Sequence, residues 1–302
     1  MDATRFIHPL LALVLSPLLA GIVNKTKACF AGRSGPPLVQ PYRDLWRLLR
    51  KGVVYSRTTS WLLRAGPIVS LAAAVTALLL LPLGGIASPL AFAGDLIVFA
   101  YLFGLVRFFM VAAALDTGSS FEGMGASREV SFSALAEPAM LLGLAALARP
   151  ADSLSLSGLL GGHGTVPAIE IPVLLLVAAA MAIILLAENA RIPVDDPNTH
   201  LELTMIHEVM ILDTSGPDLA FAGYAAWLKQ WAFAALLVGV AMPWRTGAAW
   251  SDLVLALAGV AAVGLGIGLV ESTMARLRLV RVPQLLLAAV ACAALAVVLV
   301  LR

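Results

Sequence analysis

Residues 283–301 read PQLLLAAVACAALAVVLVL, an apolar stretch without a single charged side chain. The hydrocarbon core of a bilayer is about 30 Å thick, and an α-helix crosses it with roughly 20 apolar residues. The stretch therefore predicts a transmembrane helix. The whole chain has the same character, because 61% of its 302 residues are hydrophobic and only 13% are charged. This balance excludes a single water-soluble globule, since one core cannot hide so much apolar surface.

Seven further runs of similar length precede this one. They are rich in Leu, Ala, Val and Gly and lack the alternation that is typical of half-buried strands. Lipid offers no hydrogen-bond partners, so open sheet edges cannot lie in it. We predict an all-α, polytopic membrane protein with about eight transmembrane helices in a single membrane domain, residues 1–302, and with spans near residues 6–23, 66–86, 93–115, 131–149, 169–187, 219–242, 252–270 and 283–301.

The first apolar run is similar to the core of a signal peptide. Asp2 precedes it, however, Lys25 and Lys27 follow it, and no convincing small-residue cleavage site intervenes, so we expect it to stay as a membrane anchor. The two cysteines, Cys29 and Cys292, indicate neither a disulfide nor a metal site. An iron–sulfur cluster usually needs four thiolates and is not expected within this chain.

The Lys and Arg residues outside the apolar runs gather on one predicted face. The basic loop 24–65 holds most of them, and the positive-inside rule places such loops in the cytoplasm. We therefore expect a multi-pass protein of a bacterial inner membrane with both termini outside. The basic residues of the predicted cytoplasmic face are Lys25, Lys27, Arg33, Arg43, Arg47, Arg50, Lys51, Arg57, Arg64, Arg128, Arg191, Arg276, Arg278 and Arg281, and those of the other face are Arg5, Arg149, Arg245 and Arg302.

The basic loop also contains an amphipathic pattern. Apolar residues between Tyr42 and Leu49 recur at helical spacing among Arg43, Arg47 and Arg50, which predicts a helix along the membrane surface. Such a helix could carry a docked partner. The alternative is that the loop's charges only set the topology and attract anionic lipid.

Charged residues inside the apolar runs are the first functional candidates, because they are costly in lipid. Arg107 and Glu137 lie at similar depths from the predicted inner surface and could form a pair, and Lys229 lies near the middle of the sixth run. Asp116, Glu188 and Glu271 mark inner ends of runs. We predict a polar cavity or partial proton path that opens toward the cytoplasm. Structural ion pairs and helix ends that reach for water are the alternative.

The segment between the fifth and sixth runs is unusual for a cytoplasmic loop because it is acidic. It reads ENARIPVDDP over residues 188–197 and NTHLELTMIHE over residues 198–208. Thr199 could cap a short helix that ends near Leu212 and places His200 and His207 on one face. The spacing of zinc-binding histidines in metalloproteases is absent, so no metal site is expected. Proton relay or partner contact suits the histidines better.

Three stretches together resemble a known family, the membrane subunit 1 of respiratory complex I and its hydrogenase relatives. They are GRSGPPLVQPYRDL at residues 32–45, REV at residues 128–130 and the segment 188–216. Within that segment the hydrogenase branch, with formate hydrogenlyase subunit 4 and hydrogenase-4 component C, resembles this chain most. The family skeleton is matched by Ala187, Glu188, Arg191, Pro193, Asp195, Pro197, Glu202, Leu203, Ser215 and Gly216.

The resemblance implies a membrane anchor rather than a catalyst. The chain would dock a soluble arm with the hydrogenase large and small subunits and an iron–sulfur protein, and join it to antiporter-like membrane subunits in the lipid bilayer. The nickel–iron centre and the iron–sulfur clusters would lie in those partners, with no cofactor bound by this chain alone and no nucleic acid involved. Quinone binding stays open.

Residue roles follow from the resemblance and from the intramembrane charges together. The candidates for a proton path or chamber are Arg107, Glu137, Glu188, Arg191, Asp195, Asp196, Glu202, His207, Glu208 and Lys229. The candidates for partner docking are Arg33, Gln40, Tyr42, Arg43, Asp44, Arg47, Arg128 and Glu129.

Three functions compete at this point. The first is an anchor subunit of a group 4 nickel–iron hydrogenase or formate hydrogenlyase type of complex that helps to couple electron transfer to proton translocation. The second is the quinone-site subunit of a complex I-like NADH–quinone oxidoreductase. The third is an independent ion carrier, which the apolar outer half and the one-sided charged surface disfavour.

Overall fold

The computed structural model describes residues 3–161, 171–195 and 205–302. The regular secondary structure of this part of the chain is helical, with loops between the helices and no β-strand. One isolated bridge joins Leu83 and Ile86. The elements are η1 (Ala3–Phe6), α1 (Ile7–Phe30), α2 (Gln40–Leu49), α3 (Trp61–Leu80), α4 (Asp95–Asp116), α5 (Ser120–Ala151), α6 (Leu156–Gly161), α7 (Ile171–Glu188), α8 (His207–Met210), α9 (Gly216–Ala241), α10 (Ala249–Thr273), η3 (Leu279–Arg281) and α11 (Val282–Val300).

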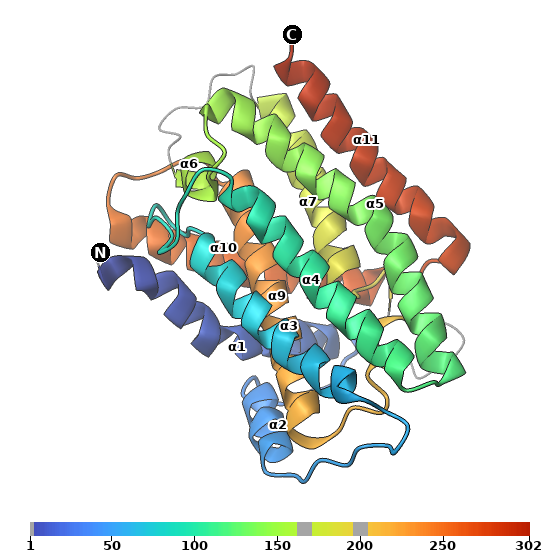
Figure 1. The fold of residues 1–302 in the computed structure, drawn as a ribbon. Helices are drawn as coiled ribbons and strands as arrows, with labels where there is room; N and C mark the ends of the chain where they lie inside the picture. Colours follow the sequence, from blue (N-terminus) through green and yellow to red (C-terminus); the bar gives the residue numbers. More distant parts are fainter. Residues whose placement is uncertain (1–2, 162–170, 196–204) are drawn as a thin grey trace.

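Eight of the described helical segments are long and apolar enough to cross a membrane, which confirms the all-α polytopic prediction. They are α1 with η1, then α3, α4, α5, α7, α9, α10, and α11 with η3. Each predicted apolar run falls within or overlaps one of them. The surface helix α2 and the short helix α6 lie at opposite ends of the bundle (Figure 1), and these ends are called the α2 end and the α6 end below.

The fourth span begins earlier than its apolar run indicated. Helix α5 starts at Ser120, so Arg128 and Glu129 lie within a helix and not in a loop before it. Glycines hid this start, because Gly has a low helix propensity. Gly125 is nevertheless required, since a Cβ atom there would lie 2.3 Å from Cγ1 of Val209. The extended first turns of α5 therefore serve as a packing surface for α8.

Helix α9 is the central helix of the bundle. It contacts α1, α2, α3, α7 and α10, and it runs through the middle of the molecule in Figure 1. Its buried positions include Ala232, Ala234 and Ala235, small residues that let neighbouring helices approach closely in a membrane protein. Polar side chains on α9 are consequently placed where several helices meet.

The glycines of α10 have the packing role that helix pairs in membranes often give to small residues. A Cβ atom at Gly264 would lie 2.5 Å from Cδ1 of Leu19, and one at Gly268 would lie 2.6 Å from Cβ of Thr26. Both contacts are with α1. Residues near the ends of these two helices, including Lys27 and Glu271, are thereby brought close together.

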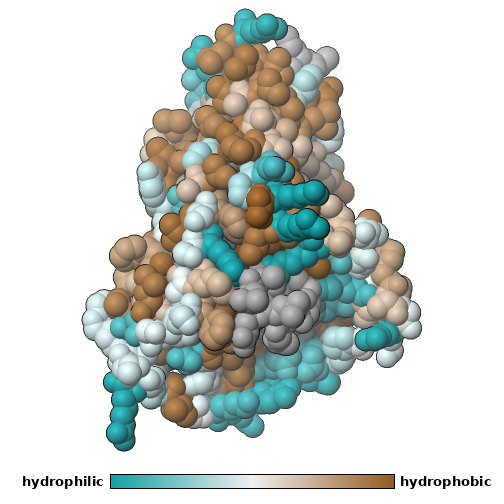
Figure 2. Space-filling view, turned by 90° about the vertical axis from the view of Figure 1, so that its right-hand side faces the viewer, coloured by the Kyte–Doolittle hydropathy of each residue, from teal (hydrophilic) through white to brown (hydrophobic). Residues whose placement is uncertain are grey.

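The predicted amphipathic helix in the basic loop is confirmed as α2. It packs against α1 and α9, and the Tyr42 hydroxyl donates a hydrogen bond of 2.5 Å to the Val14 carbonyl oxygen. Trp46 stays 59% exposed. On the face drawn in Figure 2, hydrophobic residues cover most of the half toward the α6 end, and hydrophilic residues gather toward the α2 end. The polar surface of this face is thus one-sided, as the charge pattern predicted.

The prediction of a helix from Thr199 to about Leu212 is wrong in its described part. Met205 and Ile206 are not helical, and α8 is a single turn, His207–Met210. The backbone N–H groups of Ile206 and His207 donate to the Asp195 carboxylate instead, at 3.0 and 3.4 Å, which holds this stretch in a non-helical path. Thr199 and His200 lie outside the described residues.

Candidate functional site

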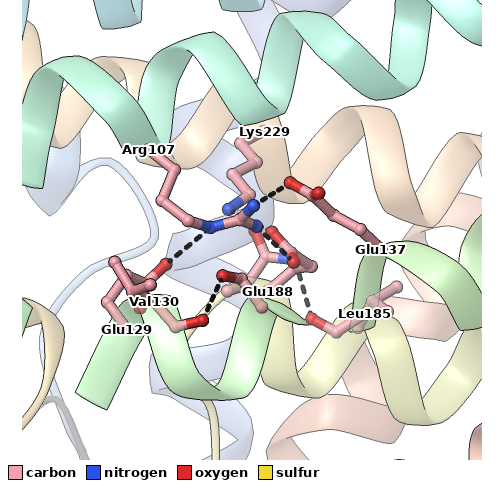
Figure 3. A network of polar contacts seen from close by, with 9 residues as sticks. Arg107, Glu129, Val130, Glu137, Leu185, Glu188 and Lys229 are labelled. Atoms are coloured by element: carbon pink, nitrogen blue, oxygen red, sulfur yellow. Dashed lines mark hydrogen bonds and ion pairs between the residues drawn. The ribbon is translucent and has the colours of Figure 1, made fainter. Parts of the chain in front are cut away.

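The candidate site is built around Arg107, which lies on α4 and is only 9% exposed. Its guanidinium contacts Glu188 of α7 at 2.6 Å, Glu129 of α5 at 3.5 Å, and Glu137 of α5. Figure 3 shows these three carboxylates converging on the one guanidinium. The five donors of a planar guanidinium allow such sharing. The predicted Arg107–Glu137 pair therefore exists, as part of a larger group.

Lys229 extends this group to the central helix. Its ammonium lies 2.7 Å from Oε2 of Glu188, whose other oxygen, Oε1, accepts from Arg107. The ammonium also lies 5.8 and 6.0 Å from the ring centres of Phe103 and Phe233. Glu188 thus bridges two cations inside the bundle. We call these residues the Arg107 cluster: Arg107, Glu129, Glu137, Glu188 and Lys229.

A second group lies beside the first and links α9 to α10 and α1. Arg191 donates to Oε1 of Gln230 at 2.7 Å and lies 3.4 Å from Oε1 of Glu271. The other oxygen of Glu271 lies 2.8 Å from the Lys27 ammonium. We call Lys27, Arg191, Gln230 and Glu271 the Arg191 cluster. Buried charges persist only when they are paired and hydrogen-bonded, and the two clusters meet this requirement.

Three members of these clusters were not among the sequence-derived site candidates. Gln230 follows Lys229 in an apolar helix, and Glu271 was noted only as the end of a span. Lys27 was assigned to the basic loop, yet it lies within α1. The available signal was the one that identified Arg107, a polar group in an apolar run. It was too weak at helix ends, where such side chains can also reach water.

A third ion pair closes the segment between α7 and α8. Asp195 is 1% exposed and lies 2.8 Å from Nη2 of Arg276, in the loop after α10. Nearby, Arg128 of α5 donates to the Met205 carbonyl oxygen at 2.9 Å. The Ile192–Pro193 peptide bond is cis. Asp195 therefore links the two described ends of the acidic segment to each other and to the loop after α10.

Members of both clusters line one cavity of about 380 Å³ near the α2 end, whereas Glu137, Lys27 and Glu271 do not line it. Its polar wall includes Arg107, Glu188, Lys229 and Gln230, together with His207 and Glu208 of α8. The remaining wall is largely apolar and comes from α1, α2, α4 and α9. A polar cavity of this size has room for several water molecules. The site can therefore hold water in contact with paired acids and bases, which is what proton movement requires.

Two chamber candidates, Asp196 and Glu202, lie outside the described residues. Of the other eight, five belong to the two clusters, one is Asp195, and two lie on α8 at the cavity wall. Among described residues, no group of three or more His, Cys, Asp or Glu side chains could hold a metal ion. Because His200 is not described, the expectation of no metal site stays a prediction.

The docking candidates divide into two sets. Arg33 and Arg43 are placed at the α2 end, where both are exposed. On α2, Asp44 accepts from Gln40 at 2.9 Å and from Arg47 at 2.6 Å, so these three side chains also organise the helix itself. Tyr42, Arg128 and Glu129 form the second set, whose side chains point inward. Each of them contacts another helix or the segment between α7 and α8.

The remaining part of the basic loop is fastened to the start of α9. Ser215 exchanges hydrogen bonds of 3.1 Å with the backbone of Val54, and the Tyr55 hydroxyl donates to Asp218 at 2.7 Å. This hydrogen bond, followed by partial burial, raises the pKa of Tyr55 above its usual value. The phenol is thus neutral and able to donate at physiological pH, and the loop has a fixed surface.

Eight apolar helices with paired charges inside one half define a polytopic membrane protein with a polar interior chamber. This chain belongs to the NADH dehydrogenase family of membrane subunits, the complex I subunit 1 family, whose family model, described as NADH dehydrogenase, matches residues 3–302. The resemblance that the sequence motifs indicated is confirmed.

Two curated relatives from Escherichia coli (strain K12) belong to the hydrogenase branch. Formate hydrogenlyase subunit 4 is 34% identical over 285 residues, which are 92% of this chain and 92% of the relative. Hydrogenase-4 component C is 34% identical over 273 residues, 87% of this chain and 84% of the relative. A chain in the solved structure of the membrane-bound sulfane sulfur reductase, an archaeal respiratory membrane complex, has a TM-score of 0.84 at 21% identity, with 98% of each chain covered. That likeness concerns the fold.

Proposed function

We propose that this chain is a membrane-anchor subunit of a group 4 nickel–iron hydrogenase or formate hydrogenlyase type of complex. In this role it docks a soluble redox arm at the α2 end and helps to couple electron transfer to proton translocation. The α2 end would face the cytoplasm, with both termini on the other side. The partners would be the hydrogenase large and small subunits, an iron–sulfur protein and antiporter-like membrane subunits.

The observation that carries the coupling role is the Arg107 cluster at the wall of the cavity. Two cations and three carboxylates from four helices share one network, so a charge change on any member alters the electrostatic energy of the others. A redox change in a docked arm near the cavity would shift these energies without any cofactor in this chain. The identity of 34% to two hydrogenase-type membrane subunits supports the choice of arm.

The surface that suits docking is the accessible part of the α2 end. Arg33 and Arg43 reach the surface there, and Trp46, with Arg50 stacked 4.4 Å over its ring, adds an amphipathic patch. Aromatic residues and arginines are enriched at the centres of protein interfaces. The fastening of the loop to α9 keeps this surface in a fixed position relative to the chamber.

The test of the assembly is purification of the tagged chain from its own membrane in mild detergent. Co-purifying proteins are identified by mass spectrometry, and the sample is assayed for nickel and iron. Nickel with iron–sulfur proteins supports the hydrogenase assignment. Iron with flavin or quinone but without nickel contradicts it in favour of the complex I-like alternative, and a chain without partners contradicts both.

The docking surface has its own test in paired charge reversals. Arg33→Glu with Arg43→Glu should release the soluble arm while the chain stays in the membrane fraction. The matched control is Arg149→Glu, an exposed arginine at the α6 end, which should keep the arm bound. Equal retention by both variants contradicts docking at the α2 end.

A second candidate, the quinone-site subunit of a complex I-like oxidoreductase, is favoured by one observation. Much of the cavity wall is apolar and includes Phe103, Met110 and Trp227, as pockets for drug-sized organic ligands usually are. A photoreactive quinone analogue distinguishes the candidates. Labelling of α1, α4 or α9 that excess ubiquinone or menaquinone prevents would support this function, and labelling that no quinone prevents would contradict it.

A further inference from the structure

We propose that the Lys27–Glu271 pair is a proton entrance to the cavity, located at the α2 end of the seam between α1 and α10. This inference rests on the proposed coupling function and assigns it a residue pair outside the Arg107 cluster. The entrance would admit protons to the cavity from the water at the α2 end.

Glu271 occupies a bridging position. Its side chain is fully buried, yet one oxygen lies 2.8 Å from the Lys27 ammonium and the other lies 3.4 Å from Nη1 of Arg191. These two cations lie on different elements, α1 and the segment after α7. A buried carboxylate between two cations is stabilised as an anion, and it becomes able to accept a proton when one cation moves away.

The side toward water is a depression in the surface of the α2 end. Lys27, Glu271 and Ser272 line it from the two helices, and Arg33 with residues 34–36 lines it from the loop after α1. The Lys27 side chain is 22% exposed there. Lysine has a flexible four-carbon stem and a strongly hydrated ammonium, so it can swing from Glu271 into water while Arg191 still contacts the carboxylate. Lys27 can thereby act as the moving part of the entrance.

The side toward the interior is the cavity of about 380 Å³. Arg191 and Gln230 line the cavity, and Arg191 contacts Glu271. The Nε atom of Arg191 and the Nε2 atom of Gln230 are buried donors without a hydrogen-bond partner in the described parts of the chain. Buried donors of this kind are usually satisfied by ordered water. Water at these atoms would connect Glu271 to the cavity, and so to Lys229 and Glu188.

The proton balance of the step is simple. When Lys27 turns to water, a hydronium ion at the surface gives its proton to Oε2 of Glu271 and leaves as water. Glu271 then breaks that O–H bond and passes the proton to cavity water beside Arg191. The return of Lys27 restores the ion pair. No electron moves in this step. In the described parts of the chain, the charged groups paired with Glu271 are Lys27 and Arg191, and Arg33 lines the same depression.

Tight packing of α10 against α1 explains why Lys27 and Glu271 lie within reach of each other. Gly264 and Gly268 bring α10 against α1 over the turns that lead up to Lys27 and Glu271. A purely structural role, joining the ends of these two helices, would produce the same contacts. The two roles differ in one respect. A structural role needs only an acceptor between Lys27 and Arg191, which an amide oxygen also provides in part, whereas a proton entrance needs a carboxylate that can take up a proton.

The experiment uses the purified complex in sealed liposomes and records hydrogen turnover and proton translocation separately. The variants are Glu271→Gln, Glu271→Asp and Lys27→Met. The control is Lys25→Met, because Lys25 is exposed and bonds only the Ser34 carbonyl oxygen in the described structure. Thermal melting of each complex checks that the bundle is intact.

The proposal expects Glu271→Gln to lower proton translocation on the order of 100-fold, as loss of a positioned proton-transfer group does. Glu271→Asp, which keeps a carboxylate, should retain more translocation than Glu271→Gln, and Lys27→Met should change the pH dependence of translocation. A Glu271→Gln complex that translocates normally, or a Glu271→Asp complex that loses as much translocation as Glu271→Gln, overturns the entrance alone. A wild-type complex that turns over hydrogen without moving protons overturns the proposed coupling function instead.

Discussion

The two ends of the bundle use the same kinds of buried charged residue in different ways. At the α6 end, Asp95 is fully buried and accepts hydrogen bonds from Leu156 N at 2.6 Å and from the Ser155 hydroxyl at 2.7 Å. Arg245 donates there to the carbonyl oxygens of Leu160 and Met242, at 2.5 and 3.2 Å. These groups satisfy polar atoms of nearby loops. At the α2 end, Arg107 and Glu188 pair with charged side chains of other helices.

The difference indicates which buried charges have only a structural role. A carboxylate whose partners are backbone N–H groups and hydroxyls ends a helix or fixes a loop, and its protonation would affect little else. A carboxylate that lies between two cations, beside a cavity with room for several water molecules, is coupled to groups on several helices. Burial and charge alone therefore do not distinguish structure from function in this membrane protein, whereas the nature of the partners does.

The largest effect should follow removal of the guanidinium that three carboxylates share. Arg107→Met takes from Glu129 and Glu137 the cation that they share and leaves Glu188 with Lys229 alone, and the loss of one partner of a buried pair costs about 3–5 kcal/mol. We expect the complex not to assemble, as native gels and hydrogen turnover would show.

The control for this substitution lies at the other end. Arg245→Met deprives two carbonyl oxygens of a donor and Asp252 of a nearby positive charge. The lost hydrogen bonds cost about 1–3 kcal/mol, so assembly should persist with a lower melting temperature. Arg107→Lys keeps one charge and should restore part of the assembly. Equal losses for Arg107→Met and Arg245→Met would remove the distinction between the two ends.

The next largest effect is expected mainly on proton translocation and less on folding. Glu188→Gln keeps the shape of the side chain, but its one amide oxygen can accept from only one of Arg107 and Lys229, and the amide cannot carry a proton. We expect proton translocation per hydrogen molecule to fall on the order of 100-fold, as for other positioned proton-transfer groups. Melting should fall less than in Arg107→Met, because Glu129 and Glu137 still pair with Arg107. The measurement pairs hydrogen turnover with the pH gradient in liposomes.

Asp252→Asn provides the comparison for this variant. Asp252 accepts from the backbone N–H and the hydroxyl of Thr246 at 2.8 and 2.7 Å, and an amide oxygen can still accept both bonds. Coupling should therefore be unchanged. If Glu188→Gln also leaves coupling unchanged, the Arg107 cluster is a structural ion-pair group like those at the α6 end.

A smaller and purely structural effect is expected at Asp95. Asp95→Ala leaves buried donors at Leu156 and Ser155 unsatisfied, which costs about 1–3 kcal/mol. Melting should fall while the ratio of protons to hydrogen stays constant. A change in that ratio would show that charge at the α6 end also takes part in coupling.

The sequence predicted the spans and the main intramembrane pair for one physical reason. Lipid penalises charge so strongly that Arg107, Glu137 and Lys229 stand out in apolar runs, and run length alone locates helices. The same reasoning did not predict that Glu129 joins Arg107, because glycines hid the start of α5. It also did not identify Glu271 with Lys27, since contacts between helices distant in sequence depend on packing at Gly264 and Gly268.

The smallest effect tests the loop that holds the proposed docking surface. Tyr55→Phe removes the hydrogen bond to Asp218 at a partly exposed site, which should cost about 0.5–1.5 kcal/mol. Since the pKa of Tyr55 is raised in the folded protein, the wild-type contribution should be complete below the ordinary value near 10 and be lost as pH rises through the raised value. Melting curves of wild type and Tyr55→Phe should therefore differ at pH 7 and converge in strongly alkaline buffer. A constant difference would contradict this pH dependence, because phenylalanine keeps the ring under Arg64, which lies 4.0 Å from its centre, and lacks only the hydroxyl. In either case the soluble arm should remain bound, because Ser215 still fastens the loop to α9 through the backbone of Val54.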